Sequence, residues 1–337
     1  MVTKIGINGF GRIARAVLRI AYYREDIEVV AINSVRDPEL LAHLLKYDSL
    51  YGPFEEEITA ESNHLIVGNN KIGIIGDRDP EKLDWSSYNV EVVVEATGKF
   101  RTRDEAAKHL GGSVENVIIT APGKNVDNTI VMGVNHDSFD PKNDFVISNA
   151  SCTTNCLAPV VKVLDEEFGI ENALMTTVHS YTMDQMILDG THKDPRRARA
   201  ANMSIIPTST GAARAVAEVL PHLKGKIDGM SFRVPTPTVS TVDLVATLKK
   251  DISIEEVNSA FSNAKDKSLK GILDYNEIPL VSADYKGSTY SAVVDGKSTM
   301  KVGESMVKVI AWYDNEWAYS VRVVDLCSHI RNGNTGS

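Results

Sequence analysis

The sequence predicts an α/β protein with two domains, one with a doubly wound parallel sheet and one α+β domain with a mixed or antiparallel sheet. The chain has 337 residues, which is long for one ordinary domain and fits two. In the first half, apolar strand-like runs alternate with helical patterns, as in parallel sheets. In the second half, strand-like runs follow one another without a regular helix between them. We expect domains over residues 1–151 and 152–315, with a final helix over 316–330 that packs back on the first.

Composition narrows the class of protein. The chain is 43% hydrophobic and 24% charged, as in soluble globular proteins, and no stretch approaches the roughly 18 apolar residues of a membrane helix. Its N-terminus enters a strand pattern at once, so we expect no leader and a cytoplasmic location. A net charge of −9 argues against nucleic-acid binding. The three cysteines, Cys152, Cys156 and Cys327, favour free thiols in a reducing compartment, and we expect no metal site because further ligands are missing.

A glycine-rich turn follows the first strand-like run, residues 4–8. Gly9, Gly11 and Ala14 form G-x-G-x-x-A, a variant of the fingerprint that holds a dinucleotide pyrophosphate at a helix N-terminus. Gly9 permits the tight turn, and Gly11 lets the backbone approach the pyrophosphate. A helical pattern then runs over about 12–22, as this mechanism requires. The sequence therefore predicts a Rossmann-type dinucleotide-binding domain.

The tip of the second strand, residues 27–34, bears on cofactor choice. Dinucleotide folds often place an acid there to bind the adenosine ribose hydroxyls. Here the tip is Asn33-Ser34, and the first acid is Asp37. An acid would repel a 2′-phosphate, whereas Ser34 could donate a hydrogen bond to it, so we expect NADP use or tolerance of both cofactors. The alternative is that Asp37 or a backbone group does the work of the acid.

The rest of the first half continues this alternation. We expect a helix over 38–47, short strands over 57–75 with a hairpin turn at 68–70, strands over 90–98 and 117–123, and a short helix after a capping box at Thr102–Glu105. Thr97 and Thr120 lie at the ends of the two later strands, where small residues suit a bound nucleotide. Arg78 lies in a polar loop and on its own would be a solvated arginine.

A cysteine stands where a strand over 145–148 gives way to a helix that ends near residue 168. Cys152 is expected in the first helical turn, where free N–H groups and the helix dipole favour a thiolate. The same N–H groups can hold an anion or a developing oxyanion. Ser151 and Thr153 could add hydrogen bonds to a phosphate. The alternative is a buried structural cysteine with ordinary capping residues.

The second half supplies further polar groups at strand ends. His179 ends a strand over 173–182 and could serve Cys152 as a base, although a lone histidine is usually structural. A polar loop over 183–206 carries a basic cluster over 192–199, which suits phosphate unless it is merely a solvated charge run. Thr210 and Gly211 open a helix that ends near residue 220. The remaining elements are expected as a strand over 227–238 that carries Arg233, strands over 239–250 and 306–313, and a helix over 254–264.

Several of these segments are similar to one known family. The chain resembles phosphorylating glyceraldehyde-3-phosphate dehydrogenases along nearly its whole length, in the segments 7–12, 151–156, 179–182, 207–211, 233–235 and 312–317. The resemblance implies oxidation of glyceraldehyde 3-phosphate by NAD or NADP through a cysteine thioester, which inorganic phosphate then cleaves. It also implies a homotetramer, with the 183–206 loop near a subunit interface and the neighbouring cofactor.

The resemblance assigns roles residue by residue. Cys152 would be the nucleophile and His179 the base. Contacts to the cofactor would come from Arg12, Ile13, Arg78, Thr120 and Asn315, with Asn315 orienting the nicotinamide amide. Thr182 and Arg233 would hold the substrate's phosphate. Inorganic phosphate would be held by Ser151, Thr153, Arg197, Thr210 and Gly211.

The chain departs from the family pattern at four places. NAD-preferring members usually have aspartate where Ser34 stands and proline where Thr191 follows Gly190, and both changes point towards NADP. Met183 replaces a usual asparagine, and Ala318 replaces a usual glycine, and neither change has a physical account at this level. Two rival functions stay open: an erythrose-4-phosphate dehydrogenase with the same thiol and histidine, and a non-catalytic regulator that senses the dinucleotide.

Overall fold

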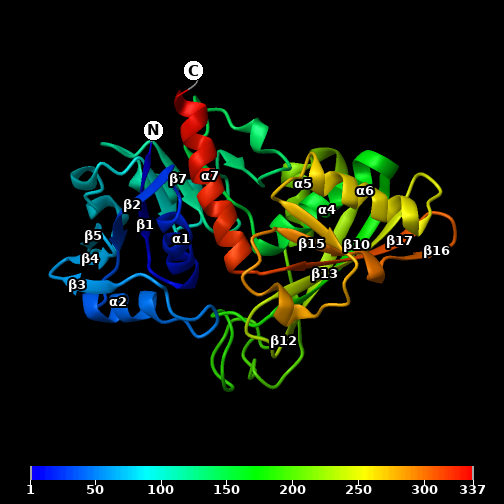
Figure 1. The fold of residues 1–337 in the computed structure, drawn as a ribbon, viewed down its shortest axis with the longest axis horizontal. Coiled ribbons are helices and arrows are strands. Elements are labelled where there is room, and N and C mark those ends of the chain that lie inside the picture. The colour runs from blue at the N-terminus through cyan, green and yellow to red at the C-terminus, as the bar shows by residue number, and fades with distance from the viewer. Residues whose placement is uncertain (1, 336–337) are drawn as a thin grey trace. The chain divides into compact units, whose positions relative to one another are not determined.

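The computed structural model describes residues 2–335 and divides into two compact units (Figure 1). The first comprises Met1–Ile130, His136–Ala150 and Ser320–Ser337, and the second comprises Val131–Asn135 and Ser151–Tyr319. Within residues 2–335, no helix combines the length and apolar character needed to cross a bilayer.

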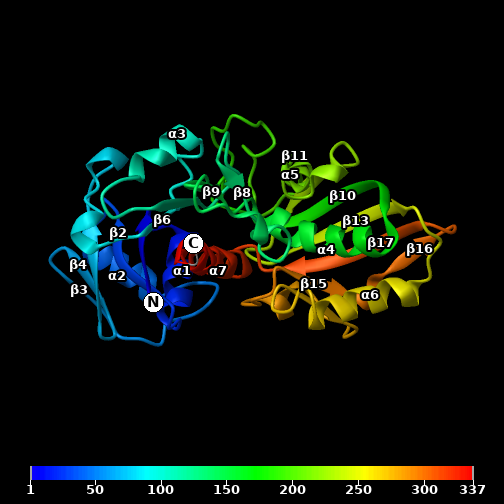
Figure 2. The ribbon, with the colours of Figure 1, turned by 90° about the horizontal axis from the view of Figure 1, so that it is seen from above.

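The first unit is built on a sheet of nine strands within the described residues, in the order β3-β4-β5-β2-β1-β6-β7-β9-β8. The strands are β1 (Thr3–Asn8), β2 (Ile27–Asn33), β3 (Ile58–Glu61), β4 (His64–Val67), β5 (Asn70–Ile75), β6 (Val92–Glu95), β7 (Asn116–Ile119), β8 (Asn128–Thr129) and β9 (Val146–Ser148). From β5 to β8 all neighbours are parallel, and only the β3-β4-β5 edge is antiparallel. Helices α1 (Arg12–Tyr22) and α2 (Pro38–Lys46) lie on one side of this sheet, and α3 (Arg103–Ala106) lies on the other (Figure 2). The predicted doubly wound fold is confirmed.

Pairing in the centre of this sheet brings three polar residues into line. Asn8 at the end of β1 is paired with Asn33 of β2 on one side and with Glu95 of β6 on the other. Strands β6, β7 and β9 are buried along their whole length, as expected for apolar strands covered on both faces. Strand β6 ends at Glu95, earlier than predicted, because the chain turns there and the Thr97 N–H bonds back to the Glu95 carboxylate at 2.8 Å.

The second unit holds a mixed sheet in the order β11-β12-β10-β13-β17-β15-β14, with β16 paired to β17. Its strands are β10 (Ile170–Ser180), β11 (Ile206–Ser209), β12 (Ile227–Val234), β13 (Ser240–Leu248), β14 (Leu273–Asn276), β15 (Ala292–Asp295), β16 (Met300–Val302) and β17 (Met306–Tyr313). Pairs β10–β12 and β14–β15 are parallel, and the others are antiparallel. The predicted mixed sheet is confirmed, although β11, β14, β15 and β16 were not expected from the sequence.

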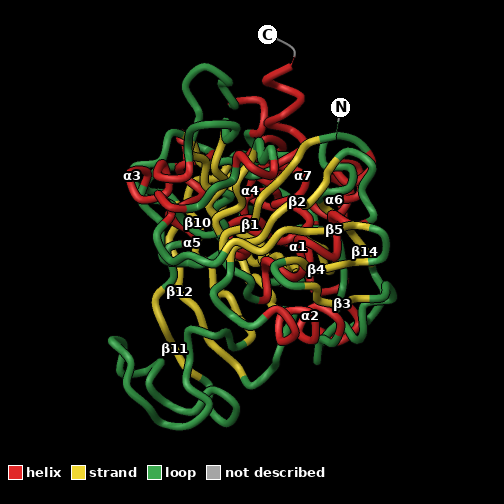
Figure 3. The backbone as a smooth tube through the Cα atoms, turned by 90° about the vertical axis from the view of Figure 1, so that its left-hand side faces the viewer, coloured by secondary structure: helices red, strands yellow, loops and turns green. Residues whose placement is uncertain are grey.

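Helices cover one face of this sheet. Helix α4 (Cys152–Phe168) packs against β13, β15 and β17 and against α5 (Ala212–Val219) and α6 (Ile254–Asp266). Every second residue of β13 is buried, from Ser240 to Leu248, which is the alternation of a strand with one covered face. The connection from β10 to β11 runs as a long loop beside β11 and β12 (Figure 3).

The final helix, α7 (Trp317–Thr335), begins in the second unit, and its residues from Ser320 onward belong to the first. Arg24 at the end of α1 bonds to Asp325 of α7 at 2.8 Å, and Ser328 donates to Asp26 at 2.6 Å. Near the start of α7, Ala318 is buried, and the structure gives no reason for alanine over glycine there. Single-turn 3-10 helices occupy Pro80–Lys82, Ser86–Tyr88, Ala107–His109, His136–Ser138, Pro221–Leu223, Ser282–Tyr285 and Gly296–Ser298.

Candidate functional site

The glycine-rich turn of the first unit has the geometry of a phosphate-binding turn. Gly9 has a φ of +88°, and a Cβ there would lie 2.9 Å from Thr97 Cγ2 and 3.1 Å from Thr97 N, so a side chain would be strained and crowded. A Cβ at Gly11 would meet nothing within 4 Å. Gly11 is also the N-cap residue of α1, where a helix offers free N–H groups. This open helix start fits a dinucleotide pyrophosphate.

The other predicted cofactor residues of the first unit lie just after sheet strands, in the loops that follow them, or in the first turn of α1. Thr120 Oγ1 donates to the Glu95 carbonyl at 3.1 Å, and Ile13 is half-buried in the first turn of α1. Arg12 bonds to Asp48 at 3.0 Å with its guanidinium over the Tyr51 ring. Arg78 is exposed in the loop after β5.

Ser34 directly follows β2 and is accessible in part. Its N–H donates to the Ile75 carbonyl at 2.9 Å, and its Oγ accepts from the Arg36 N–H at 3.3 Å. Asp37, the alternative ribose-binding acid, caps α2, because its Oδ1 accepts from the N–H groups of Glu39 and Leu40. That cap occupies one oxygen of the nearest acid and supports the interpretation based on Ser34.

Cys152 is the first residue of α4, as predicted. Ser151 is the N-cap residue, and its Oγ accepts from the Thr154 N–H at 3.0 Å. Ala150, just before it, has a φ of +53°, a conformation that costs a non-glycine residue about 1–3 kcal/mol. The chain thus turns sharply before the helix and leaves the thiol at the helix N-terminus.

His179 reaches this thiol from the end of β10. Its Nε2 lies 3.5 Å from Cys152 Sγ, and its Nδ1 lies 2.7 Å from the Ser180 carbonyl oxygen. Because a carbonyl oxygen only accepts, Nδ1 carries the proton and Nε2 presents its lone pair to the thiol. The pair has the geometry of a nucleophile with a general base.

Burial sets the charge state of this pair. Burial raises the pKa of the Cys152 thiol, although the positive charge of Arg233 and hydrogen bonds from Thr153 work in the opposite direction. Burial, together with the charge of Arg233, lowers the pKa of His179 to about 3. Burial thus works against the thiolate that the helix N-terminus is expected to favour. Both pKa shifts favour the uncharged forms of the thiol and the imidazole.

Arg233 stands next to this pair because β10 and β12 run parallel with His179 opposite Arg233. Its Nη1 lies 3.0 Å from His179 Nδ1 and donates to the Ser180 carbonyl at 3.0 Å and to Thr182 Oγ1 at 3.3 Å. Its Nε is buried and has no hydrogen-bond partner within the described chain. Thr182 and Arg233, predicted together, are thus brought together.

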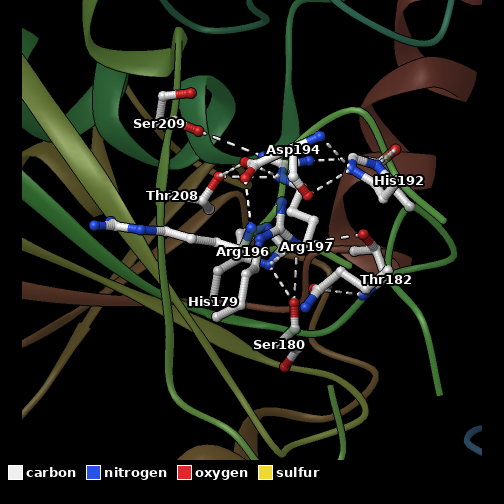
Figure 4. Close-up of polar contacts among 12 residues, drawn as sticks. His179, Ser180, Thr182, His192, Asp194, Arg196, Arg197, Thr208 and Ser209 are labelled. Atoms are coloured by element: carbon white, nitrogen blue, oxygen red, sulfur yellow. Dashed lines mark hydrogen bonds and ion pairs between the residues drawn. The ribbon is translucent and has the colours of Figure 1, made fainter. Parts of the chain in front are cut away.

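Two arginines of the basic cluster in the 183–206 loop are paired with carboxylates, and Figure 4 shows the contacts around Arg197 and Asp194. Arg197 pairs with Asp184 and lies 3.7 Å from Asp194, and its Nε donates to Thr208 Oγ1 at 3.0 Å. The prediction of a basic cluster missed these carboxylates, which lie within reach only after folding. An anion at Arg197 would compete with the carboxylate of Asp184.

The residues that are predicted to hold inorganic phosphate differ in their exposure. Thr210 Oγ1 accepts from the Ala212 N–H at 3.2 Å, and Gly211 is the exposed N-cap of α5. Thr153, by contrast, is buried, and its Oγ1 is 2.9 Å from the hydroxyl of Tyr313. This placement does not favour a phosphate contact by the Thr153 side chain.

Two further sets of predicted cofactor residues lie in the second unit. Asn315 is buried, and its Oδ1 accepts from Ser240 Oγ at 2.9 Å. Gly190 and Thr191 are exposed in the 183–206 loop, where the Gly190 N–H donates to the Ala198 carbonyl at 2.9 Å. Met183 is also exposed there, and nothing in the structure explains its replacement of a polar residue.

Sequence reasoning missed Tyr313. Its hydroxyl is 2.9 Å from both Thr153 Oγ1 and Thr177 Oγ1, and its ring meets the edge of the His179 ring at a centroid distance of 6.0 Å. Tyr313 therefore fixes the start of α4 and the histidine together. The segment 312–317 that resembles the family contains Tyr313, but the resemblance gave this residue no role, and its place at the end of an apolar strand is typical of a core residue.

Comparison with known proteins decides the family. Residues 3–103 match the family model described as glyceraldehyde 3-phosphate dehydrogenase, NAD binding domain, and residues 151–315 match the C-terminal domain of the same family. The chain belongs to the glyceraldehyde-3-phosphate dehydrogenase family. The predicted family is confirmed, and membership makes the chain an oxidoreductase that acts on an aldehyde with a nicotinamide dinucleotide.

Relatives in this family match nearly end to end. The glyceraldehyde-3-phosphate dehydrogenase of Geobacillus stearothermophilus is 60% identical over 330 residues, which are 98% of each chain. Glyceraldehyde-3-phosphate dehydrogenase 2 of Bacillus subtilis is 57% identical over 98% of this chain and 97% of its own. Glyceraldehyde-3-phosphate dehydrogenase 2 of a Nostoc species is 53% identical over 96% of this chain and 97% of its own.

Proposed function

We propose that this chain converts D-glyceraldehyde 3-phosphate and inorganic phosphate into 1,3-bisphosphoglycerate, reversibly, with NAD or NADP. The observation that carries the proposal is the Cys152 Sγ–His179 Nε2 approach of 3.5 Å, with Arg233 bonded beside it. A nucleophile, a base and a cation for a phosphate are thereby gathered at the ends of α4, β10 and β12. This is the set that covalent oxidation of a phosphorylated aldehyde requires.

The first half of the reaction forms a bond to sulfur. His179 Nε2 takes the thiol proton as Cys152 Sγ attacks the aldehyde carbon, and the carbonyl oxygen then receives that proton to give a hemithioacetal. N–H groups at the start of α4 stabilise the oxygen while it is negative, by about 3 kcal/mol per well-placed donor. An unprotonated His179 beside a protonated Cys152 suits this step, because the imidazole can accept the thiol proton as the sulfur attacks.

The second half releases the acyl group. His179 takes the hydroxyl proton of the hemithioacetal, and the bound nicotinamide supplies the hydride acceptor. A thioester on Cys152 results. Inorganic phosphate attacks its carbonyl carbon, the sulfur leaves with the bonding electrons, and His179 returns a proton to it. The product is an acyl phosphate.

Two groups of residues are proposed to hold the phosphates. Thr182 and Arg233 hold the substrate's own phosphate, supported by their bond to each other and by the unpaired Arg233 Nε. Inorganic phosphate is held by Ser151, Thr153, Arg197, Thr210 and Gly211, with Thr153 acting through its backbone N–H because its hydroxyl is bonded to Tyr313.

The cofactor is proposed to be NADP, with NAD tolerated. The exposed Thr191 and the partly accessible Ser34 support NADP, because neither brings a negative charge to a 2′-phosphate. The proposed contacts are Gly9, Gly11, Arg12, Ile13, Ser34, Arg78, Thr97, Thr120, Gly190, Thr191 and Asn315.

Organisation beyond the site is also proposed. Residues 1–151 with the helix over 316–330 form the dinucleotide-binding domain, and 152–315 form the catalytic domain. The chain works as a cytoplasmic homotetramer, without nucleic-acid or membrane partners. Support for assembly comes from apolar side chains of the 183–206 loop that are more than two thirds exposed: Met183, Ile187, Leu188, Met203 and Ile205.

The test is steady-state kinetics with each nicotinamide cofactor, with and without inorganic phosphate, on the wild type and on Cys152→Ser. Wild-type turnover on glyceraldehyde 3-phosphate should require phosphate, and Cys152→Ser should lower it by about a thousandfold or more while dinucleotide binding is kept. Full activity in Cys152→Ser would refute the mechanism. Faster turnover of erythrose 4-phosphate, or binding without turnover, would favour a sister dehydrogenase or a dinucleotide-sensing regulator.

A further inference from the structure

In the first unit, five buried polar side chains form one hydrogen-bond network next to the strand ends that are proposed to bind the cofactor. Trp85 Nε1 donates to His109 Nδ1 at 3.2 Å, and His109 Nε2 lies 3.2 Å from Glu95 Oε2. The same carboxylate oxygen accepts from Asn8 Nδ2 at 2.5 Å. Asn8 Oδ1 accepts from Asn33 Nδ2 at 2.7 Å. All five side chains are more than nine-tenths buried.

The direction of each hydrogen bond in this network follows from which atoms can donate and which can accept. An indole N–H can only donate, so His109 Nδ1 holds a lone pair and its Nε2 carries the proton. His109 is therefore a neutral donor to Glu95 Oε2. Its Nε2 lies 3.3 Å from Asn8 Nδ2 because both atoms donate to that oxygen.

Glu95 lies at the centre of this network, and both of its carboxylate oxygens accept hydrogen bonds. Its Oε1 accepts from the Thr97 N–H at 2.8 Å and from the Thr97 hydroxyl. Four donors therefore surround one buried carboxylate, and both of its oxygens accept hydrogen bonds. Within residues 2–335, no lysine or arginine bonds to Glu95, and its carboxylate is contacted by the hydrogen-bond donors of Asn8, Thr97 and His109.

The members of this network stand next to proposed cofactor contacts. Gly9 follows Asn8, and Ser34 follows Asn33. The Asn33 carboxamide also bonds to both backbone groups of Asp77, the residue before Arg78, at 2.8 Å and 3.2 Å. Thr97 bonds to the carboxylate itself and packs on Gly9. One network thus spans four strand ends or loops that the dinucleotide is proposed to touch.

We infer that Glu95 is a positioning residue for the cofactor. Its carboxylate accepts four hydrogen bonds, and through them it holds the backbone turns at Gly9, Ser34, Arg78 and Thr97 in one arrangement. The inference rests on the proposed function, since it assumes that the dinucleotide binds at this edge. Glu95 does not touch the cofactor in this assignment and takes no part in the chemistry.

The isosteric variant Glu95→Gln tests this inference. Glutamine has one acceptor oxygen, so its amide N–H₂ must face either the Thr97 N–H or the donors of Asn8 and His109. The Thr97 N–H can only donate, so it cannot pair with this amide. The Asn8 side-chain amide could flip to present its oxygen, but it would then lose the hydrogen bond from Asn33. We expect Glu95→Gln to raise the Kd of NAD, measured by titration calorimetry, by about tenfold or more. The KM for the dinucleotide should rise in parallel, whereas kcat and the alkylation rate of Cys152 without cofactor should stay near wild type.

A rescue variant separates this role from general loss of structure. It combines Asn8→Asp with Glu95→Gln, so that the new amide donates to the new carboxylate, which accepts in turn from Asn33 and from His109 Nε2. The double variant should recover dinucleotide binding to within about threefold of wild type. The matched control is Asp144→Asn, another buried carboxylate of the first unit, bonded to Asn128 away from these turns. It should leave the Kd unchanged.

The outcomes are distinct. If wild type binds neither NAD nor NADP, the proposed function fails. If wild type binds and Glu95→Gln binds equally well, the inference is overturned. Should Glu95→Gln not fold, His109→Phe decides in its place, because it removes one donor from the carboxylate. A Kd raised about threefold would support the inference, and an unchanged Kd would overturn it.

Discussion

At the scale of single residues, burial shifts both the nucleophile and the base of the site towards their uncharged forms. Burial disfavours the thiolate of Cys152 and the imidazolium of His179, and Arg233 partly offsets the first effect while adding to the second. The 3.5 Å approach lets the proton pass between them when an aldehyde arrives.

The pH dependence of Cys152 alkylation follows from these pKa shifts. Only the thiolate reacts, so the rate in cofactor-free protein should rise at a higher pH than for an ordinary thiol. No step should appear near pH 6.5, because His179 stays neutral until about pH 3. Arg233→Gln should move the rise further upward, since the Arg233 charge lowers the thiol pKa. Iodoacetamide kinetics from about pH 5 to pH 10 measure this, and a midpoint below that of free cysteine would contradict it.

Cofactor choice is tested at Ser34. Placing a carboxylate there should repel the 2′-phosphate, so Ser34→Asp should raise the KM for NADP by about tenfold and leave the KM for NAD near its starting value. Ser34→Ala serves as the control for loss of the hydroxyl without added charge. An NADP/NAD preference that is the same in Ser34→Asp and wild type would count against the assignment.

The sequence predicted residues whose position follows from strand ends, and missed effects that need a partner from elsewhere in the fold. Cys152, His179 and Arg233 were predicted, and strands β10 and β12 do bring the histidine and the arginine side by side. The burial of Thr153 under Tyr313 and the pairing of Arg197 with Asp184 were not predicted. Each of those depends on tertiary contacts, which local patterns do not encode.

At the scale of elements, the start of α4 is the decisive one. Its first turn is held by the Ser151 cap, by the Thr153–Tyr313 bond and by the Ser151–Thr154 hydroxyl pair at 2.7 Å. A neighbouring helix of the same unit, α6, starts with the capping box of Ser253 and Glu256. The two helices share the same capping chemistry, but only α4 carries a reactive group in its first turn.

Removing each cap should separate stability from reactivity. Ser151→Ala and Ser253→Ala should each lower the free energy of unfolding by about 1 kcal/mol, because each leaves helix N–H groups without an acceptor. Only Ser151→Ala should also change turnover and the alkylation rate of Cys152. Chemical denaturation and kinetics on both variants provide the measurement, and an equal effect of the two on turnover would show that the cap plays no part in the chemistry.

Long, strongly patterned elements were predicted best. Helix α1 and strand β17 have the predicted bounds, whereas β14, β15 and β16 were not foreseen. Those three have four residues or fewer and gain their structure from pairing with other strands. Strand β6 was predicted too long because its polar end turns back on Glu95, a contact visible only after folding.

At the scale of the whole molecule, the 183–206 loop exposes several large apolar side chains. It exposes Ile187, Leu188 and Met203, while Arg197 and Arg199 are paired with carboxylates of the same loop. Apolar side chains displayed in this way are typical of an interface.

Assembly through this loop is testable. Ile187→Glu combined with Leu188→Glu should shift the proposed tetramer towards dimer or monomer, since burying two carboxylates in an apolar contact is costly. Ile278→Glu, at another exposed apolar position, should leave the assembly unchanged. Sedimentation equilibrium distinguishes these states, and an intact tetramer in the double variant would mean that subunits join elsewhere.

The return of α7 to the first unit affects how the polypeptide acquires its structure during synthesis. Arg24 and Asp26 pair with Asp325 and Ser328, which are separated from them by 301 and 302 positions in the chain. The nucleotide-binding half therefore emerges first from the ribosome yet is completed last, after the thiol-bearing half has already been made. A stop codon before Ser320 would leave the earliest-made half without its closing helix.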